Sequence, residues 1–472
     1  MRILLKAGKI VTAAEEFVGD ILIEGEHISA IGKNISSDEE MEVLDVSGKF
    51  ITPGGVDVHA HFALPMFNTI SSDDHYSGHK AAAFGGTTTV FDFINQDELS
   101  LKKNIAIWHK KADSIAAVDF GFHMNITTFN AQVAEEIPCL RALGINSLKV
   151  FTAYNGRLRL QDGDIFKVLR IAKDHGLLVM VHAENGDVID ILVDEAREAG
   201  RYTPEWHALT RPAEGAVESV FRTIQLAKMA EAPVYIVHMN TAGGVAQVKA
   251  ARDQGFPVMG ETCPPYLFFT IDELRRTDGA KWICSPPMRT KEDNQGIQNY
   301  LGQDVLQVIA TDHCPFFFDG TKSITYEGEE VKIPGKELGK DDFTKIPNGL
   351  PGVGDRMLVM WNYGVLKGMI TPQQFVATHC TNPAKIFGIY PQKGTLMPGS
   401  DADLVIWEPD TPLVYGVKSA QHRTDYNLYE GWKMQDRIQK VFLRGQLIVD
   451  QGNWLGKKGQ GRFLNCNDPE VI

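Results

Sequence analysis

Long apolar stretches are missing from this 472-residue chain, and no uninterrupted run is long enough to span a bilayer. The first residues, Met1 to Lys6, reach a lysine before any signal-peptide core forms, so we expect a cytoplasmic protein with no membrane partner. An excess of positive charge is also missing, because 47 lysines and arginines face 60 aspartates and glutamates, which gives a net charge of −13. Nucleic acid and anionic surfaces are therefore poor candidate partners.

Cysteine is scarce as well, and none of the six cysteines forms a CxxC pair. A reduced protein explains this pattern better than a disulfide framework does. Cys314 lies two positions after a candidate metal ligand, Asp312, and could tune a site there. A small, buried packing residue is the favoured interpretation of Cys314.

The middle of the chain alternates short apolar segments with longer helical stretches, such as Asp164–His175 and Gly243–Gln254. Eight such βα repeats predict a parallel barrel, whose chemistry lies at the carboxyl ends of its strands. The expected strands are Val56–His61, Thr87–Ile94, Phe120–Ile126, Ser147–Thr152, Leu177–Ala183, Ala232–Met239, Pro257–Glu261 and Val305–Thr311.

Both ends of the chain have the texture of short β-strands broken by glycines. We therefore predict an α/β protein: a (β/α)8 TIM-like barrel with a small β-sandwich domain built from both chain ends. The expected boundaries are residues 1–53 plus 380–455 for the sandwich, 54–379 for the barrel and 456–472 for a C-terminal tail. A long polar loop at 316–346 follows the eighth strand, and its length and position favour a lid.

Polar side chains stand where the apolar strands of the expected barrel end. His59 and His61 are separated by one residue, so on a strand both imidazoles face the same side, as a shared metal ion requires. Any one such histidine is more often a structural residue. Several at matching strand ends are hard to explain by packing, because barrel interiors prefer branched apolar residues. The full set is His59, His61, Lys149, His182, His238 and Asp312.

Lys149 is the unusual member of this set, because it lies within an apolar strand, in Ser147-Leu148-Lys149-Val150-Phe151. A buried ammonium is disfavoured by desolvation and would be repelled by nearby metal cations. The alternative, a lysine that snorkels to the surface, is difficult to reconcile with a central strand.

The motif Pro53-Gly54-Gly55-Val56-Asp57-Val58-His59-Ala60-His61 resembles the opening signature of the amidohydrolase superfamily. More narrowly, the chain resembles the dihydropyrimidinase/D-hydantoinase family of cyclic amidohydrolases, from the first strand to about Phe463. The further segments that support this resemblance include Ser72-Asp73-Asp74, His182-Ala183-Glu184-Asn185, Glu261-Thr262-Cys263-Pro264, Ser285-Pro286-Pro287, Ala310-Thr311-Asp312-His313-Cys314-Pro315 and Ile346-Pro347-Asn348-Gly349.

The resemblance implies a binuclear metal site with two divalent ions. His59, His61 and Asp312 would hold one ion, and His182 and His238 would hold the second. Lys149, converted by carbon dioxide to a carbamate, would bridge the two. Zinc suits this mixed imidazole and carboxylate set, and manganese or cobalt are possible substitutes.

The resemblance further implies hydrolysis of the cyclic amide bond of dihydropyrimidines and 5-substituted hydantoins to N-carbamoyl amino acids. Asp312 would transfer the proton, Tyr154 would donate its hydroxyl to the developing oxyanion, and Ser285 and Asn348 would hold the ring amide. From the residues alone, Ser285 and Asn348 are an ordinary loop residue and a turn former. The partners implied are a small cyclic amide and further copies of the chain, as a tetramer or dimer.

Other functions remain open at this point. An allantoinase or dihydroorotase type of ring-opening amidase is the nearest alternative, although Phe62-Ala63-Leu64 follows the histidine pair where a dihydroorotase would carry an arginine. A non-catalytic dihydropyrimidinase-like scaffold protein is a second, and a mononuclear deaminase a third. The loop after the first strand carries Leu64, Met66 and Phe67, which either cradle a ring substituent or simply pack.

Overall fold

The computed structural model of the protein describes residues 2–66, 69–326 and 328–472. Eight parallel strands follow one another in sequence order around a barrel, and a bridge between Ala60 and His313 links its first and last strand segments. The predicted barrel is therefore confirmed. The barrel strands are β6 (Gly55–Ala60), β9 (Thr87–Ile94), β10 (Asp119–Asn125), β11 (Ser147–Phe151), β12 (Leu178–His182), β13 (Val234–Ile236), β14 (Val258–Thr262) and β15 (Val308–Ile309).

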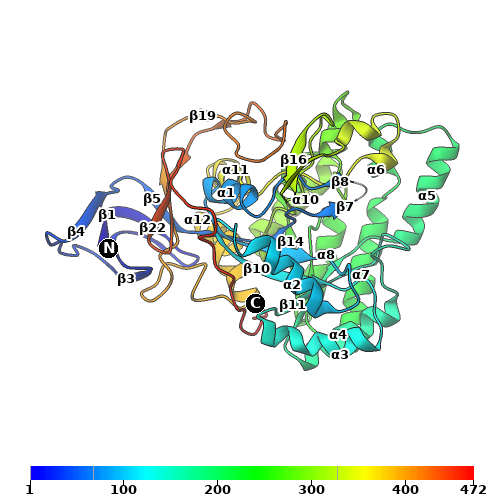
Figure 1. Cartoon of the computed structure of the whole chain (residues 1–472), viewed down its shortest axis with the longest axis horizontal. Helices are drawn as coiled ribbons and strands as arrows, with labels where there is room; N and C mark the ends of the chain where they lie inside the picture. The colour runs from blue at the N-terminus through cyan, green and yellow to red at the C-terminus, as the bar shows by residue number, and fades with distance from the viewer. Residues whose placement is uncertain (1, 67–68, 327) are drawn as a thin grey trace.

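Helices surround the barrel and cover the outward faces of its strands (Figure 1). Most alternate with the strands, as the repeats predicted, and α4 and α8 begin two residues and one residue before their expected starts. The helices are α1 (Ser77–Phe84), α2 (Leu101–Ala112), α3 (Ala131–Glu136), α4 (Asp162–Asp174), α5 (Gly186–Glu198), α6 (Glu205–Leu209), α7 (Ala213–Ala230), α8 (Ala242–Asp253), α9 (Pro264–Phe268), α10 (Lys291–Gly302), α11 (Arg356–Val359), α12 (Pro372–Val376) and α13 (Asn382–Ile386).

The two ends of the chain meet in a second domain, where blue N-terminal and red C-terminal strands lie together in Figure 1. Its nine strands belong to one sheet, in which β5 of the first segment pairs with β18 of the last. The sheet encloses its own apolar core, which includes Ile10, Ile51 and Phe442. The strands are β1 (Arg2–Val11), β2 (Glu16–Glu24), β3 (His27–Gly32), β4 (Met41–Asp45), β5 (Phe50–Pro53), β18 (Leu404–Glu408), β21 (Arg437–Leu443), β22 (Gln446–Asp450) and β23 (Asn453–Trp454).

A buried ion network joins this sheet domain to the barrel. Lys393 is almost fully buried, and its ammonium contacts Asp119 of β10 at 2.6 Å, Asp401 at 3.0 Å and Asp403 at 2.9 Å. Asp119 also pairs with Arg444, which follows β21. The tail at 456–472 runs along the barrel of its own chain, where Leu464 donates its backbone N–H to Phe120. The domain boundaries at 53/54 and 379/380 stay a prediction.

The long loop after β15 contains structure of its own. A hairpin of β16 (Ser323–Tyr326) and β17 (Glu329–Lys332) is followed by short helical turns at Lys336–Gly339 and Phe343–Lys345. Two further small antiparallel sheets occur among the described residues: β7 (Pro65–Met66) pairs with β8 (Thr69–Ile70), and β19 (Leu413–Val414) pairs with β20 (Lys433–Met434). The function of the loop at 316–346 as a lid stays a prediction.

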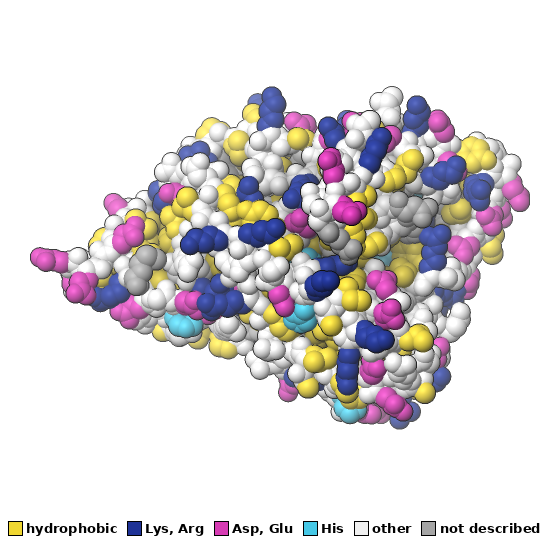
Figure 2. Space-filling view, in the orientation of Figure 1, with side chains coloured by type: hydrophobic (Ala, Val, Ile, Leu, Met, Phe, Trp, Pro, Cys, Tyr) yellow, Lys and Arg dark blue, Asp and Glu magenta, His cyan; other side chains and the backbone are white. Residues whose placement is uncertain are grey.

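The surface agrees with the charge balance of the sequence. On the face seen in Figure 2, acidic and basic side chains are interspersed rather than gathered by sign. Within the described ranges, no helix combines the length and hydrophobicity that a membrane crossing needs. The six cysteines, all of them described, are free.

Candidate metal centre

One cavity of about 300 Å³ opens at the carboxyl ends of the barrel strands. Every candidate site residue from the sequence lines it, although they come from widely separated segments. These residues are His59, His61, Lys149, Tyr154, His182, His238, Ser285, Asp312 and Asn348. Barrel closure therefore brings the whole predicted set together in one cavity.

Three of these residues form a cluster with the spacing of a metal site. Donor atoms of His59, His61 and Asp312 all lie within 4.8 Å of one another. The Asp312 carboxylate is 3.2 Å from His59 Nε2 and 3.1 Å from His61 Nε2. Although burial alone would raise it, the pKa of Asp312 is held well below its usual range by these histidines.

The other two histidines form a pair beside this cluster, where the ring centre of His238 lies 5.4 Å from that of His59. His182 Nδ1 lies 2.9 Å from His238 Nε2, and both side chains are almost fully buried. Burial and the neighbouring His182 lower the pKa of His238 well below its usual value. His238 is therefore neutral at physiological pH, which is the form of imidazole that binds a metal.

Two glutamates orient the imidazole rings of His59 and His182. Glu261 Oε1 lies 2.6 Å from His59 Nδ1, and Glu184 Oε2 lies 2.9 Å from His182 Nε2. Each carboxylate fixes a proton on the ring nitrogen that it faces, which leaves the opposite nitrogen, Nε2 of His59 or Nδ1 of His182, as the one that would bind a metal. Imidazole and carboxylate donors with this support fit a zinc-type site.

Lys149 projects from β11 into the same cavity and is 2% exposed. Its ammonium lies 4.8 Å from the ring centre of Phe93 and 5.5 Å from that of Phe151. Burial lowers the pKa of Lys149 to about 8, although Asp312 and Glu261 oppose the shift. About a tenth of the amine is therefore neutral at pH 7, against a few in ten thousand for an ordinary lysine, and the neutral amine is the form that reacts with carbon dioxide.

The backbone around the cavity is strained at three site residues. Tyr154, His238 and Asp312 have φ values of 69°, 37° and 51°, in the left-handed region that side chains other than glycine avoid. Such residues cost about 1–3 kcal/mol each and occur where the fold holds them for function. The strands that lead to His238 and Asp312 are shorter than predicted. β13 stops at Ile236 and β15 at Ile309, whereas the sequence predicted strands that reach Met239 and Thr311.

The remaining site residues, Tyr154, Ser285 and Asn348, form a further wall of the same cavity. The ring centre of Tyr154 lies 5.2 Å from that of His182, and burial raises the pKa of Tyr154 well above its usual value. Its hydroxyl is therefore protonated and able to donate. Asn348 Nδ2 donates to Ser285 Oγ at 3.3 Å, which joins two loops at the wall. Leu64 and Met66 line the cavity, whereas Phe67 lies outside the described residues.

Sequence reasoning gave no role to Glu261, Glu184 or the cavity residues Phe93, Asp97 and Arg157. A signal existed for the glutamates. Glu184 follows His182 by two positions, and Glu261 lies in the seventh expected strand. A charged residue in an apolar strand segment indicates a buried partner. Phe93, Asp97 and Arg157 carried no comparable signal.

Lys336, from the loop after β15, is a second fully buried lysine beside this wall. Its ammonium donates to the backbone oxygens of Ile283 at 2.8 Å and Lys281 at 3.3 Å, just before Ser285. Burial lowers the pKa of Lys336 from 10.5 to about 7, with Cys284 and Cys314 opposing the shift. The loop is thus anchored to the cavity wall by a cation in an unfavourable environment.

The lowered pKa of Lys336 makes the stability of the folded chain depend on pH. Between pH 7 and 10.5 the unfolded chain binds more protons at this lysine than the folded chain, so folded stability rises with pH across that window. Replacement by Met removes the linkage. The urea midpoint of the wild type is expected to rise relative to that of Lys336→Met as the pH is increased from 6 to 10. A difference between the two midpoints that stays constant over this range would contradict the lowered pKa of Lys336.

Comparisons with known proteins extend over the whole chain. Residues 50–448 match the amidohydrolase family. A D-hydantoinase of Geobacillus stearothermophilus is 42% identical over 466 residues, which covers 98% of this chain and 96% of that protein. A D-hydantoinase of Streptomyces coelicolor is 39% identical over 469 residues, covering 98% and 97%. The crystal structure of a dihydropyrimidinase from Brevibacillus agri superposes with a TM-score of 0.94 at 41% identity, covering 100% of both chains.

Proposed function

The chain belongs to the amidohydrolase family, and from this premise we propose that it hydrolyses the cyclic amide bond of 5-substituted hydantoins and dihydropyrimidines. The products are N-carbamoyl amino acids. One observation carries the proposal: the His59, His61 and Asp312 cluster and the His182 and His238 pair lie side by side in a single cavity. The chain has this cavity and matches hydantoinases over nearly its full length.

The family is metal-dependent, and the donor set specifies how two divalent ions would be held. His59, His61 and Asp312 would hold one ion, His182 and His238 the other, and a carbamate on Lys149 would contact both. Zinc is the proposed metal because imidazole and carboxylate donors suit it, with manganese or cobalt as alternatives. When bound, two such ions lower the pKa of the attacking water and polarise the ring carbonyl.

The side chains of the cavity supply the rest of the reaction. Asp312 accepts a proton from the attacking water and delivers it to the departing ring nitrogen. The Tyr154 hydroxyl donates to the oxygen on which negative charge develops. Ser285 and Asn348, which lie together at the wall, hold the ring amide. Leu64 and Met66 contact the substituent at ring position 5.

Replacing Tyr154 with Phe is expected to lower kcat by about 10²–10³, the usual cost of removing one donor to an oxyanion. Because Tyr154 is outside the proposed ligand set, the variant should keep the wild-type metal content. Steady-state kinetics on hydantoin and metal analysis of the same preparation check both expectations. An unchanged kcat would remove Tyr154 from the reaction.

A substrate panel tests the function itself. Hydantoin, 5-phenylhydantoin, dihydrouracil, dihydroorotate and allantoin are incubated with the zinc-loaded enzyme, and ring opening is followed by loss of ultraviolet absorbance. Hydantoins and dihydrouracil are expected to react with the highest kcat/KM. Preference for dihydroorotate or allantoin would instead identify a different ring-opening amidase.

A non-catalytic scaffold is the alternative from another class, and the filled ligand positions count against it. Metal analysis separates the two, because a scaffold would bind no stoichiometric metal. The chain is also proposed to form a homo-oligomer, a tetramer or dimer. Large apolar side chains stand exposed on α5 and α7, at Ile191, Phe221 and Met229, as at subunit interfaces. Sedimentation of the full chain determines the oligomeric state.

A further inference from the structure

Asp312 is held in its strained conformation by its two neighbours in the chain. On one side, the backbone N–H and the hydroxyl of Thr311 both contact the buried carboxylate of Asp57, at 3.2 and 2.6 Å. On the other side lies His313, which is fully buried and lies outside the set that lines the cavity. A backbone in the left-handed region persists only when surrounding contacts determine it. The contacts of His313 therefore bear directly on Asp312.

The main chain of His313 ties Asp312 to the two histidines of its cluster. His61 donates its backbone N–H to the His313 carbonyl oxygen at 2.7 Å. The backbone N–H of His313 points in turn to the carbonyl oxygen of His59 at 3.4 Å. Any movement of His313 would thus shift Asp312 relative to both rings.

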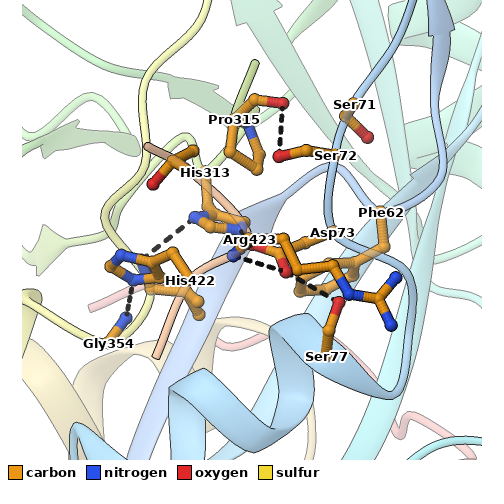
Figure 3. A network of polar contacts seen from close by, with 12 residues as sticks. Phe62, Ser71, Ser72, Asp73, Ser77, His313, Pro315, Gly354, His422 and Arg423 are labelled. Atoms are coloured by element: carbon orange, nitrogen blue, oxygen red, sulfur yellow. Dashed lines mark hydrogen bonds and ion pairs between the residues drawn. The ribbon is translucent and has the colours of Figure 1, made fainter. Parts of the chain in front are cut away.

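The side chain of His313 is fixed in one tautomer. Its Nδ1 accepts hydrogen bonds from the backbone N–H groups of Gly352 at 3.0 Å and Val353 at 3.3 Å. The proton must therefore lie on Nε2, which is 3.2 Å from the carboxylate of Asp73. Figure 3 shows Asp73 beside His313, at the start of the segment that leads into α1.

Asp73 is itself anchored from two further segments, and it is fully buried. It accepts a hydrogen bond from the Ser77 hydroxyl at 2.7 Å, and the backbone N–H of Arg423 contacts both of its oxygens at 3.2 and 3.3 Å (Figure 3). One carboxylate thus holds α1, the segment at Arg423 and, through His313, the end of β15.

We infer that Asp73 and His313 are positioning residues for Asp312: the Asp73 carboxylate fixes the His313 ring, and His313 fixes the direction of the Asp312 side chain. Neither residue lines the cavity, so neither is a catalytic residue. The inference rests on the proposed function, because it assigns a role in that reaction. It predicts that a change at Asp73 lowers turnover and metal affinity while substrate binding persists.

The adjacent Asp74 provides a matched control. Its carboxylate accepts hydrogen bonds from the backbone N–H groups of Tyr76 and Ser77, and it pairs with the Arg423 guanidinium. It therefore anchors the same helix and the same segment as Asp73. Asp73→Asn is expected to lower kcat 10–100-fold with KM within twofold. Asp74→Asn should change kcat by less than twofold.

Zinc affinity gives a readout that does not depend on activity. The metal-free proteins are titrated with zinc alone against a chromophoric chelator. Asp73→Asn should bind its weaker zinc ion about tenfold less tightly than wild type, whereas Asp74→Asn should match wild type. Equal losses in both variants, or losses that simply follow a lowered Tm, would overturn the inference.

Two substitutions at His313 test the role of Asp73 if Asp73→Asn fails to fold. A glutamine amide at this position reaches the place of Nε2 and keeps the contact with Asp73. An asparagine amide reaches only the place of Nδ1 and keeps the contact with Gly352. His313→Gln should therefore retain at least tenfold more kcat than His313→Asn. The opposite order overturns the role of Asp73, and absence of ring opening by the wild type would instead refute the proposed function.

Discussion

Replacing Lys149 with Ala is expected to lower turnover by about three orders of magnitude and to remove much of the bound metal. A carbamate on Lys149 is the one proposed ligand shared by both ions, so its loss leaves neither ion fully held. Metal ions contribute several kcal/mol to charge stabilisation in such reactions, and each 1.36 kcal/mol is a factor of ten in rate. The measurements are kcat on hydantoin and zinc per chain after gel filtration.

The pH dependence of reconstitution tests the carbamate itself. The pKa of Lys149 is lowered to about 8, and only the neutral amine reacts with carbon dioxide. At a fixed concentration of dissolved carbon dioxide, the rate at which zinc reactivates the metal-free enzyme should therefore rise as pH increases through about 8 and then level off. A flat rate between pH 6 and 9 would argue against this chemistry.

Two controls test whether a carboxylate, rather than the volume of the side chain, is what the site requires at position 149. A short carboxylic acid such as acetate, added to Lys149→Ala, fits the vacated volume and should restore part of the activity and metal content. Lys149→Arg keeps a cation but cannot form a carbamate, so the same acid should leave it inactive. Two tightly held ions in Lys149→Ala without any added acid would contradict the bridging role.

Asp312→Asn should lower kcat by about 10³–10⁴ while leaving metal content largely intact. General acid–base catalysis contributes up to about 10⁴ in rate, and a carboxamide cannot take the proton. Its oxygen can still bind a metal. The backbone is also preserved, because asparagine tolerates the left-handed conformation at φ 51° as aspartate does.

A second acidic residue of the cavity provides the control for Asp312. Asp97 lines the same cavity and has no part in the proposed proton transfer. Asp97→Asn should keep kcat within a few-fold of wild type, which shows that loss of negative charge alone is not the cause. Near-normal turnover by Asp312→Asn would remove this residue from the proton transfer.

The sequence predicted the barrel from local pattern, and the same pattern indicated the polar residues at its strand ends, whereas Ser285 and Asn348 came only from the family resemblance. Apolar strands followed by His182, His238 and Asp312 were readable as strand ends that face one mouth. The left-handed backbone at His238 and Asp312 was not readable, since nothing in an isolated strand requires it. It arises from contacts across the barrel, such as those of Thr311 with Asp57.

Residues that act through others were the hardest to identify. Asp73 entered the sequence analysis only within the segment Ser72-Asp73-Asp74, and its neighbour Asp74 is the one that accepts backbone N–H groups at the start of α1. Its contact with His313 joins positions 240 residues apart, and no spacing rule reaches that far. Lys336 lies in the polar loop at 316–346, and its burial was not readable because the carbonyl oxygens that it contacts belong to the distant residues Lys281 and Ile283.

The pairing of β5 with β18 has a consequence for how the polypeptide is made. During synthesis the first five strands emerge early, yet β5 waits with an open edge until residue 404 has left the ribosome. Joining the two directly would require closure of a very long loop, whose entropic cost a folded barrel reduces by bringing the ends close. The barrel is therefore expected to fold first. Chains that terminate before β18 would expose an unpaired apolar strand edge and aggregate.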